Sequence, residues 1–199
     1  MIAAVLFDLD GVLIDSRDAW YHLLCAAARD LGYPSIQRDV FDASFGQGIA
    51  ADVAQFFPRT TPAGLEAYFD AHFLEHARHV LVDPAAAPVM QALAQRGIAV
   101  AIVTNTTSAL ARETVRGAGL EPDLLVGASD VPHGKPAPDM VLLACERLGV
   151  PPGRALLVGD SRFDRAAARA AGVRFVGYGL AGDARIDRLP ELLALPDLA

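Results

Sequence analysis

The chain has 199 residues, of which 53% are hydrophobic, and this is enough for one sizeable core with a small inserted subdomain. Its formal net charge is −7 and it has no basic run, so neither nucleic acid nor an anionic membrane is expected as a partner. The apolar runs are too short to cross a bilayer, the N-terminal segment lacks a signal-like basic region, and Cys25 and Cys145 show no pairing or metal spacing, so we expect a cytoplasmic protein with reduced thiols.

The first predicted element is a strand over residues 2–7, a short apolar run typical of a strand covered on both faces. It leads directly into Asp8 and Asp10. Two residues apart on an extended backbone, these carboxylates share a face and lie roughly 6.6 Å apart. Because an unpaired charge is costly beside a buried strand, the pair indicates either a site or two acids that shape a turn.

Residues 16–80 contain no convincing strand and follow a helical pattern over 17–31, 48–57 and 62–80, separated by glycine and proline. We therefore expect a helical insert at residues 16–80. The other domain, residues 1–15 and 81–199, is expected to form the core.

The rest of the chain alternates strands and helices of about ten residues, which predicts βαβ units and a parallel sheet. The fold class is therefore α/β. Expected strands cover 98–105, 124–129, 155–160 and 174–179, and expected helices cover 85–95, 108–117, 138–148 and 162–171, most of which a glycine follows closely.

Polar side chains collect where these strands end, which is where open parallel sheets bind ligands. Besides the two N-terminal acids, the candidates are Thr104, Asn105, Lys135, Asp160, Ser161 and Asp164. Lys135 is the only lysine among seventeen basic residues. Converging carboxylates suit a hard cation such as Mg²⁺, and a lysine and a threonine suit phosphate oxygens.

Four motifs in order resemble those of the haloacid dehalogenase superfamily: FDLDGVLIDS (7–16), IVTN (102–105), HGKPAPD (133–139) and VGDSRFDRAAARAAG (158–172). The chain is similar to the phosphatase branch, near phosphoglycolate phosphatase and β-phosphoglucomutase relatives. The resemblance implies a Rossmann-like three-layer core, with the helical insert as a small α-helical cap.

The resemblance also implies roles for the strand-end residues. Asp8 would be the nucleophile and Asp10 the general acid–base. Phosphate would be bound by Thr104, Asn105 and Lys135, although Asn105 could instead bind another part of the substrate or cap a helix. Mg²⁺ would be held by Asp8, Asp160 and the backbone carbonyl of Asp10.

Several further residues have two interpretations. Gly11 is expected to allow a backbone conformation closed to other residues. Asp164 lies one helical turn after Asp160 and could hold Lys135 or a metal-bound water, or only favour the helix dipole. Ser161 is a site residue or a helix N-cap.

Within the insert, Arg17 could bind a second anionic group of the substrate or be solvated. Gln47, in the loop 45–48, could select substrate or belong to a plain interhelix loop. His72, His76 and His79 share a helical spacing that could bind a metal, but we prefer an exposed face of the insert.

These observations predict a Mg²⁺-dependent phosphatase acting on a small phosphorylated metabolite, phosphoglycolate-like or a sugar phosphate, through an aspartyl phosphate. A phosphomutase shares Asp8 and Asp10 and is the alternative. The alternative from another class is a non-catalytic phosphometabolite-binding or interaction module. Such a protein should have lost Asp8, Asp10, Lys135 or Asp160, and all four are present. A monomer or a small homo-oligomer is expected.

Overall fold

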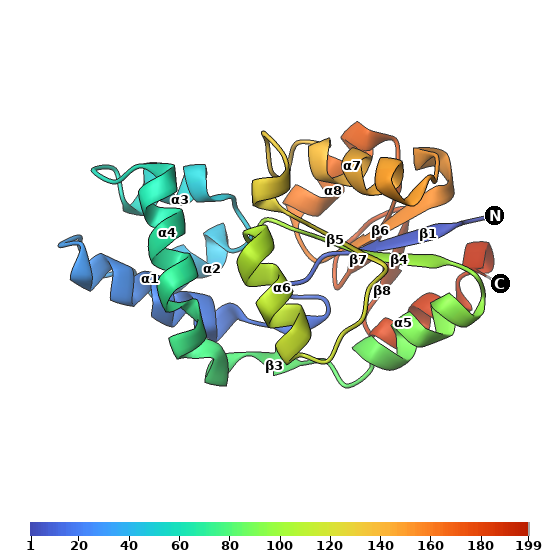
Figure 1. Cartoon of the computed structure of the whole chain (residues 1–199), viewed down its shortest axis with the longest axis horizontal. Coiled ribbons are helices and arrows are strands. Elements are labelled where there is room, and N and C mark those ends of the chain that lie inside the picture. The colour runs from blue at the N-terminus through green and yellow to red at the C-terminus, as the bar shows by residue number, and fades with distance from the viewer. Residues whose placement is uncertain (199) are drawn as a thin grey trace.

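The computed structural model describes residues 1–198 and contains a parallel six-stranded sheet (Figure 1). In spatial order the strands are β5 (Leu124–Gly127), β4 (Ala99–Thr104), β1 (Ala4–Phe7), β6 (Ala155–Gly159), β7 (Arg174–Tyr178) and β8 (Ala184–Ile186). The order of connection reverses at β1, so this strand lies at the topological switch point of the sheet.

The register brings the ends of the three central strands together. Phe7, the last residue of β1, is aligned with Ile102 of β4 and with Val158 of β6. Every residue of β1 and β6 is buried, as expected for central parallel strands built from apolar residues. The residues that follow β1, β4 and β6 therefore meet at one edge of the sheet.

Helices cover both faces of the sheet. The apolar residues of α5 (Ala86–Gln95) and α6 (Ser108–Gly117) pack with Val5 and Phe7 on one face. Those of α7 (Asp139–Leu148) and α8 (Arg162–Ala171) pack with Ala4 and Leu6 on the other. Alternate residues of β1 thus serve two separate cores, which gives the three-layer Rossmann-like arrangement that the sequence predicts.

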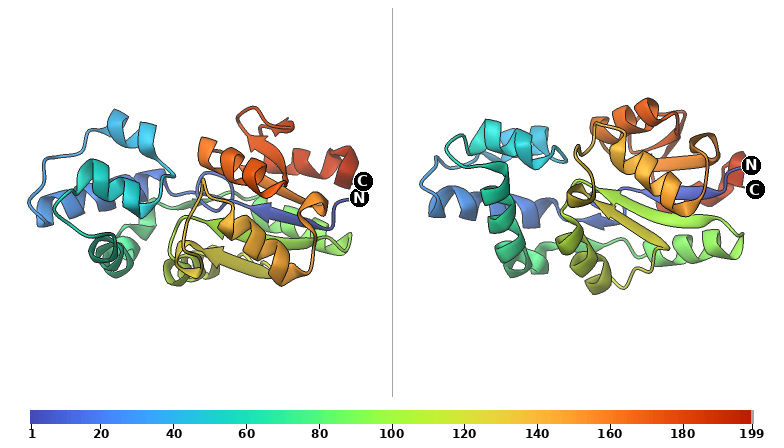
Figure 2. Two further views of the ribbon diagram at one scale, coloured as in Figure 1. Left: turned by 90° about the horizontal axis from the view of Figure 1, so that it is seen from above. Right: turned by 45° about the horizontal axis from the view of Figure 1, so that its top comes forward.

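The helices of residues 16–80 group beyond the carboxyl end of the sheet, away from the two chain ends (Figure 2). They build a separate apolar core around Leu23, Phe57 and Phe69, which Leu110 of α6 joins. Two short antiparallel strands, β2 (Ile14–Asp15) and β3 (Leu81–Val82), connect the core to the helices of residues 16–80 and back again. The exact boundaries of two domains stay a prediction. The elements are α1 (Arg17–Asp30), α2 (Arg38–Ser44), α3 (Ile49–Phe56), α4 (Pro62–His72) and the 3₁₀ helix η1 (Phe73–His79).

The structure differs from the sequence prediction in three elements. The helix expected over 62–80 divides into α4 and η1, and the four-residue recurrence of Leu65, Phe69 and Phe73 runs through the junction without marking it. Helix α2 buries only Phe41 and Ser44, which is too few positions for a periodic signal. Strand β8 has only three residues, too few for its sequence to predict a strand.

The remaining short 3₁₀ helices connect the main elements. They are η2 (Ala128–Asp130), η3 (Pro152–Arg154), η4 (Leu189–Ala194) and η5 (Pro196–Leu198). Within residues 1–198, no helix is long and apolar enough to span a membrane. Both cysteines are free thiols.

Candidate active site

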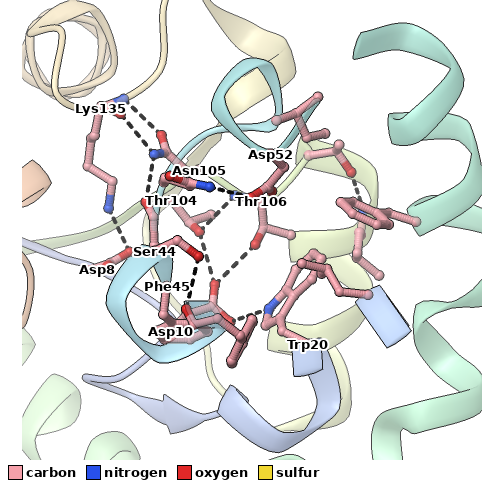
Figure 3. A pocket seen from close by; sticks show the side chains of 18 residues that line it. Asp8, Asp10, Trp20, Ser44, Phe45, Asp52, Thr104, Asn105, Thr106 and Lys135 are labelled. Atoms are coloured by element: carbon pink, nitrogen blue, oxygen red, sulfur yellow. Dashed lines mark hydrogen bonds and ion pairs between the residues drawn. The ribbon is translucent and has the colours of Figure 1, made fainter. Parts of the chain in front are cut away.

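A pocket lies where the ends of β1 and β4 face the helical insert (Figure 3). Its empty volume is about 680 Å³, which includes open solvent at its mouth. Asp8, Asp10, Thr104, Asn105 and Lys135 line it from the core side. The structure therefore brings five of the candidates predicted at the strand ends to one pocket.

Lys135 is the cation of this site and is only 3% exposed. Its Nζ lies 2.7 Å from Asp8 Oδ1 and 2.6 Å from Asp164 Oδ1, and it donates a hydrogen bond of 3.1 Å to the Val103 carbonyl oxygen. Burial lowers the pKa of this ammonium, but Asp164 and Asp8 outweigh that effect and hold the pKa above its ordinary value. Lys135 is therefore charged and fixed in place.

Three carboxylates crowd around this one ammonium. Oxygens of Asp8, Asp160 and Asp164 lie within 4.8 Å of one another. Burial, and next the charge of Asp164, raise the pKa of Asp8 well above its ordinary value. The same two causes raise the pKa of Asp160 to about 6. A further cation beside these acids would relieve their repulsion, so the donor set fits Mg²⁺.

Both carboxylate oxygens of Asp164 have partners within the protein. Oδ1 faces Lys135, while Oδ2 accepts a hydrogen bond from the Ser161 backbone N–H at 3.1 Å and contacts the Ser161 hydroxyl. Ser161 in turn caps α8 by accepting from the Asp164 N–H at 3.2 Å. These contacts suit Asp164 to holding Lys135, and they place Ser161 at the helix N-cap.

Asp10 points away from the other acids and into the pocket. Its carboxylate contacts the Ser16 hydroxyl and accepts hydrogen bonds from Trp20 Nε1 at 3.1 Å, Thr106 Oγ1 at 3.0 Å and Thr104 Oγ1 at 3.3 Å (Figure 3). Its side chain is not in the group of three close carboxylates. The two N-terminal acids therefore have separate surroundings.

Gly11 is required by both backbone and space. Its φ is +86°, in the region that favours glycine. A Cβ built there would lie 2.1 Å from Asp160 Oδ2, an impossible contact. The absence of a side chain at position 11 thus lets Asp160 approach the turn after β1.

Asn105 fixes the loop that carries Lys135. Its Oδ1 accepts from the Lys135 N–H at 2.8 Å, and its Nδ2 donates to the Lys135 carbonyl oxygen at 2.9 Å. The same Nδ2 donates to the Gly46 carbonyl oxygen of the insert at 3.1 Å. Asn105 does not cap α6, because Thr107 holds the N-cap position.

The two specificity candidates lie in different surroundings. Arg17 stacks over the Phe45 ring at 4.5 Å and pairs with Asp42 at 3.7 Å, on a hollow shared with Gly11 and Asp160. Gln47 lines the main pocket. Its Nε2 donates to Asp52 Oδ1 at 2.8 Å and to Gln55 Oε1 at 3.0 Å.

His72, His76 and His79 do not converge. His72 pairs with Glu75 at 2.9 Å, whereas the rings of His76 and His79 approach His22 at 6.3 and 4.5 Å. Within residues 1–198, the acidic group around Lys135 is the only set of three possible metal ligands that comes together.

The sequence interpretation missed four residues that line or complete the pocket. Thr106 follows Thr104 by two positions, the spacing that shares a face on extended chain. Trp20 follows Ser16 by four positions, the spacing that shares a face on a helix. Ser16 itself is fully buried and directs its hydroxyl to Asp10 instead of capping α1. Asp52 on α3 carries no sequence signal, because its place depends on how the insert packs.

Comparisons with known proteins agree on one family. The family model for haloacid dehalogenase-like hydrolases matches residues 2–172. Two relatives named phosphoglycolate phosphatase are similar: one from Cupriavidus necator is 34% identical over 96% of this chain and 92% of its own, and one from Chromobacterium violaceum is 32% identical over 98% and 96%. The crystal structure of a subfamily IA hydrolase of the same superfamily from Geobacter sulfurreducens is 26% identical, with a TM-score of 0.80 over 98% of this chain and 99% of that one.

Proposed function

The chain belongs to the haloacid dehalogenase-like hydrolase family and is an enzyme of its phosphatase branch, and we propose that it hydrolyses small phosphate monoesters with Mg²⁺ through an aspartyl phosphate on Asp8. The observation that carries this proposal is the separation of the two acids. Asp8 faces Lys135 and the other carboxylates, whereas Asp10 faces the open pocket among hydroxyl and indole donors.

In the first step, a carboxylate oxygen of Asp8 attacks phosphorus and the bond from phosphorus to the ester oxygen breaks. Asp10, in its protonated form, gives its proton to the departing oxygen, so an alcohol leaves. Lys135 holds the attacking carboxylate in place at 2.7 Å. The products of this step are the alcohol, the acyl phosphate of Asp8 and the ionised Asp10.

In the second step, Asp10 takes a proton from water as the water oxygen attacks phosphorus. The bond between phosphorus and the Asp8 oxygen breaks, which releases inorganic phosphate and restores both carboxyl groups. The hydroxyls of Thr104 and Thr106 and the Trp20 indole orient Asp10 for both transfers.

Asp8 and Asp160, with the Asp10 backbone carbonyl, would hold Mg²⁺, which neutralises charge on the transferring phosphoryl group when bound. Lys135 supplies a positive charge of the chain itself beside Asp8. Thr104, at the end of β4, would donate to a phosphate oxygen by turning its hydroxyl hydrogen away from Asp10.

The substrate is a small phosphorylated metabolite, either phosphoglycolate, as the names of the relatives suggest, or a sugar phosphate. The insert would close over it, exclude water until the second step and open for release. We expect a cytoplasmic enzyme that is active as a monomer or small homo-oligomer; the two free cysteines agree with a reducing compartment.

The test is phosphate release from a panel of phosphate esters and pyrophosphate, with Mg²⁺ and then with EDTA. We expect release that needs Mg²⁺ and is abolished by Asp8→Asn. Asp10→Asn should slow hydrolysis and accumulate the phosphoenzyme. Turnover retained by Asp8→Asn would refute the nucleophile. Isomerisation of sugar phosphates without phosphate release would indicate a phosphomutase.

A further inference from the structure

The half of the pocket that faces the insert differs from the charged core side. It is mostly apolar, formed by Trp20, Leu24, Phe41, Phe45, Ile49, Phe69 and Leu110. One ionisable group from the insert enters it, Asp52 of α3. The leaving group of a phosphate ester bound at Asp8 would extend into this half, because Asp8 and Lys135 occupy the core side.

The pocket offers no spare positive charge to a leaving group. The titratable residues that line it are Asp8, Asp10, Asp52 and Lys135. Lys135 is the only cation among them and is already held by two carboxylates. Arg17 stacks on Phe45 and lines a different hollow. A carboxylate on the leaving group would therefore meet an excess of negative charge.

The side-chain donors around the space for the leaving group are also engaged. The Trp20 indole donates to Asp10, and the Asn105 amide donates to backbone carbonyl oxygens. The Gln47 amide donates to Asp52 and Gln55. What the lining presents to a leaving group is thus an acceptor, the Asp52 carboxyl.

Asp52 is well placed to act as that acceptor. It is half-buried, and its Oδ1 is oriented by the hydrogen bond from Gln47. Within residues 1–198, no hydrogen bond is assigned to its Oδ2, which leaves that oxygen available. Burial raises the pKa of Asp52 to about 7, so the carboxyl is mostly ionised at pH 8.

We propose that Asp52 is a specificity residue that selects phosphate monoesters whose leaving group carries a hydroxyl or ammonium donor, and that the pocket rejects leaving groups ending in a carboxylate, phosphoglycolate included. This inference rests on the proposed phosphatase function and narrows its substrate class. The apolar wall would contact the carbon chain, and Asp52 would bind the distal donor. Gln47 is a positioning residue that acts through Asp52.

The test uses alkyl phosphates of two to four carbons that differ only in the terminal group: methyl, hydroxyl, ammonium or carboxylate. At pH 8 with Mg²⁺, we expect kcat/KM for the hydroxyl or ammonium ester to exceed that of the carboxylate ester of equal length by at least about tenfold, because close like charges in a partly buried site repel strongly. Equal rates, or preference for the carboxylate ester, would overturn the inference.

Asp52→Asn should lower kcat/KM for the ammonium ester, raise it for the carboxylate ester and leave the methyl ester nearly unchanged. The matched control is Asp39→Asn, which removes the same charge from an exposed position of the insert outside the pocket and should leave every ratio unchanged. Unchanged ratios in Asp52→Asn would also overturn the inference. The failure of the phosphatase function is distinct, since no ester, the methyl ester included, would then show turnover that depends on Asp8.

Discussion

Replacing Lys135 with methionine keeps most of the side-chain volume and removes the one ammonium of the site. Its two ion pairs, at 2.7 and 2.6 Å, are each worth about 6 kcal/mol at an effective dielectric constant of about 20. The desolvation of the ammonium offsets much of this, and losing one partner of a buried pair costs about 3–5 kcal/mol. We expect Lys135→Met to lower the free energy of unfolding by about 4 kcal/mol at pH 8.

The loss should depend on pH in a definite direction. Burial and the charge of Asp164 already raise the pKa of Asp8, and removal of the ammonium raises that pKa further. A carboxyl whose folded pKa exceeds its unfolded value destabilises the folded protein at high pH, and this cost disappears as pH falls and a proton replaces the missing charge. At pH 5 we expect a loss of about 2 kcal/mol.

The assay is urea unfolding with EDTA at pH 5 and pH 8, followed by far-UV circular dichroism and by the fluorescence of Trp20, the only tryptophan. Coincident transitions would justify a two-state free energy. The control is Arg188→Met, which removes an exposed pair with Glu191 at 3.2 Å and should leave the free energy of unfolding nearly unchanged. A loss in Lys135→Met that equals the control, or that is the same at both pH values, would refute this account of the site.

Three further changes test neighbouring parts of the structure. Gly11→Ala should lower the free energy of unfolding by about 1–3 kcal/mol, because the backbone conformation and Asp160 both oppose a Cβ. It should also weaken the rise in melting temperature that Mg²⁺ produces. Unchanged urea unfolding and an unchanged Mg²⁺ titration would contradict this. Asp52→Asn should stabilise the protein by about 1–3 kcal/mol at pH 8 and little at pH 4, since the raised pKa makes ionisation costly in the folded state; equal gains in urea unfolding at both pH values would disprove the cause. Asn105→Ala frees the Lys135 loop and should lower kcat at least about tenfold in phosphate-release kinetics, with less than about 2 kcal/mol lost in unfolding; normal kcat would argue against this positioning role.

The sequence predicted those parts of the fold that repeat a short-range pattern. Helix α8 begins and ends at the expected residues, because Ser161 caps one end and Gly172 closes the other in a left-handed conformation. The gathering of Asp8, Lys135 and Asp160 also follows from sequence, since parallel strands end at a common edge.

What the sequence could not supply depends on packing across long separations. Trp20 on α1 donates to Asp10 after β1, a contact between two elements on either side of the β2 strand. Asp52 enters the pocket only because α3 packs with α4 above it. The placement of Asp52 has no periodicity that the sequence alone could show.

The contact between Asn105 and the insert has a consequence for how such an enzyme can diversify. The acceptor on the insert is the backbone carbonyl oxygen of Gly46, not a side chain. The flanking loop residues can therefore change, and with them the contacts to substrate, while the insert keeps its docking point on the core. Only position 46 itself is restricted, because its φ of +85° favours glycine. New specificities can thus arise in the loop without rebuilding the site that carries out the chemistry.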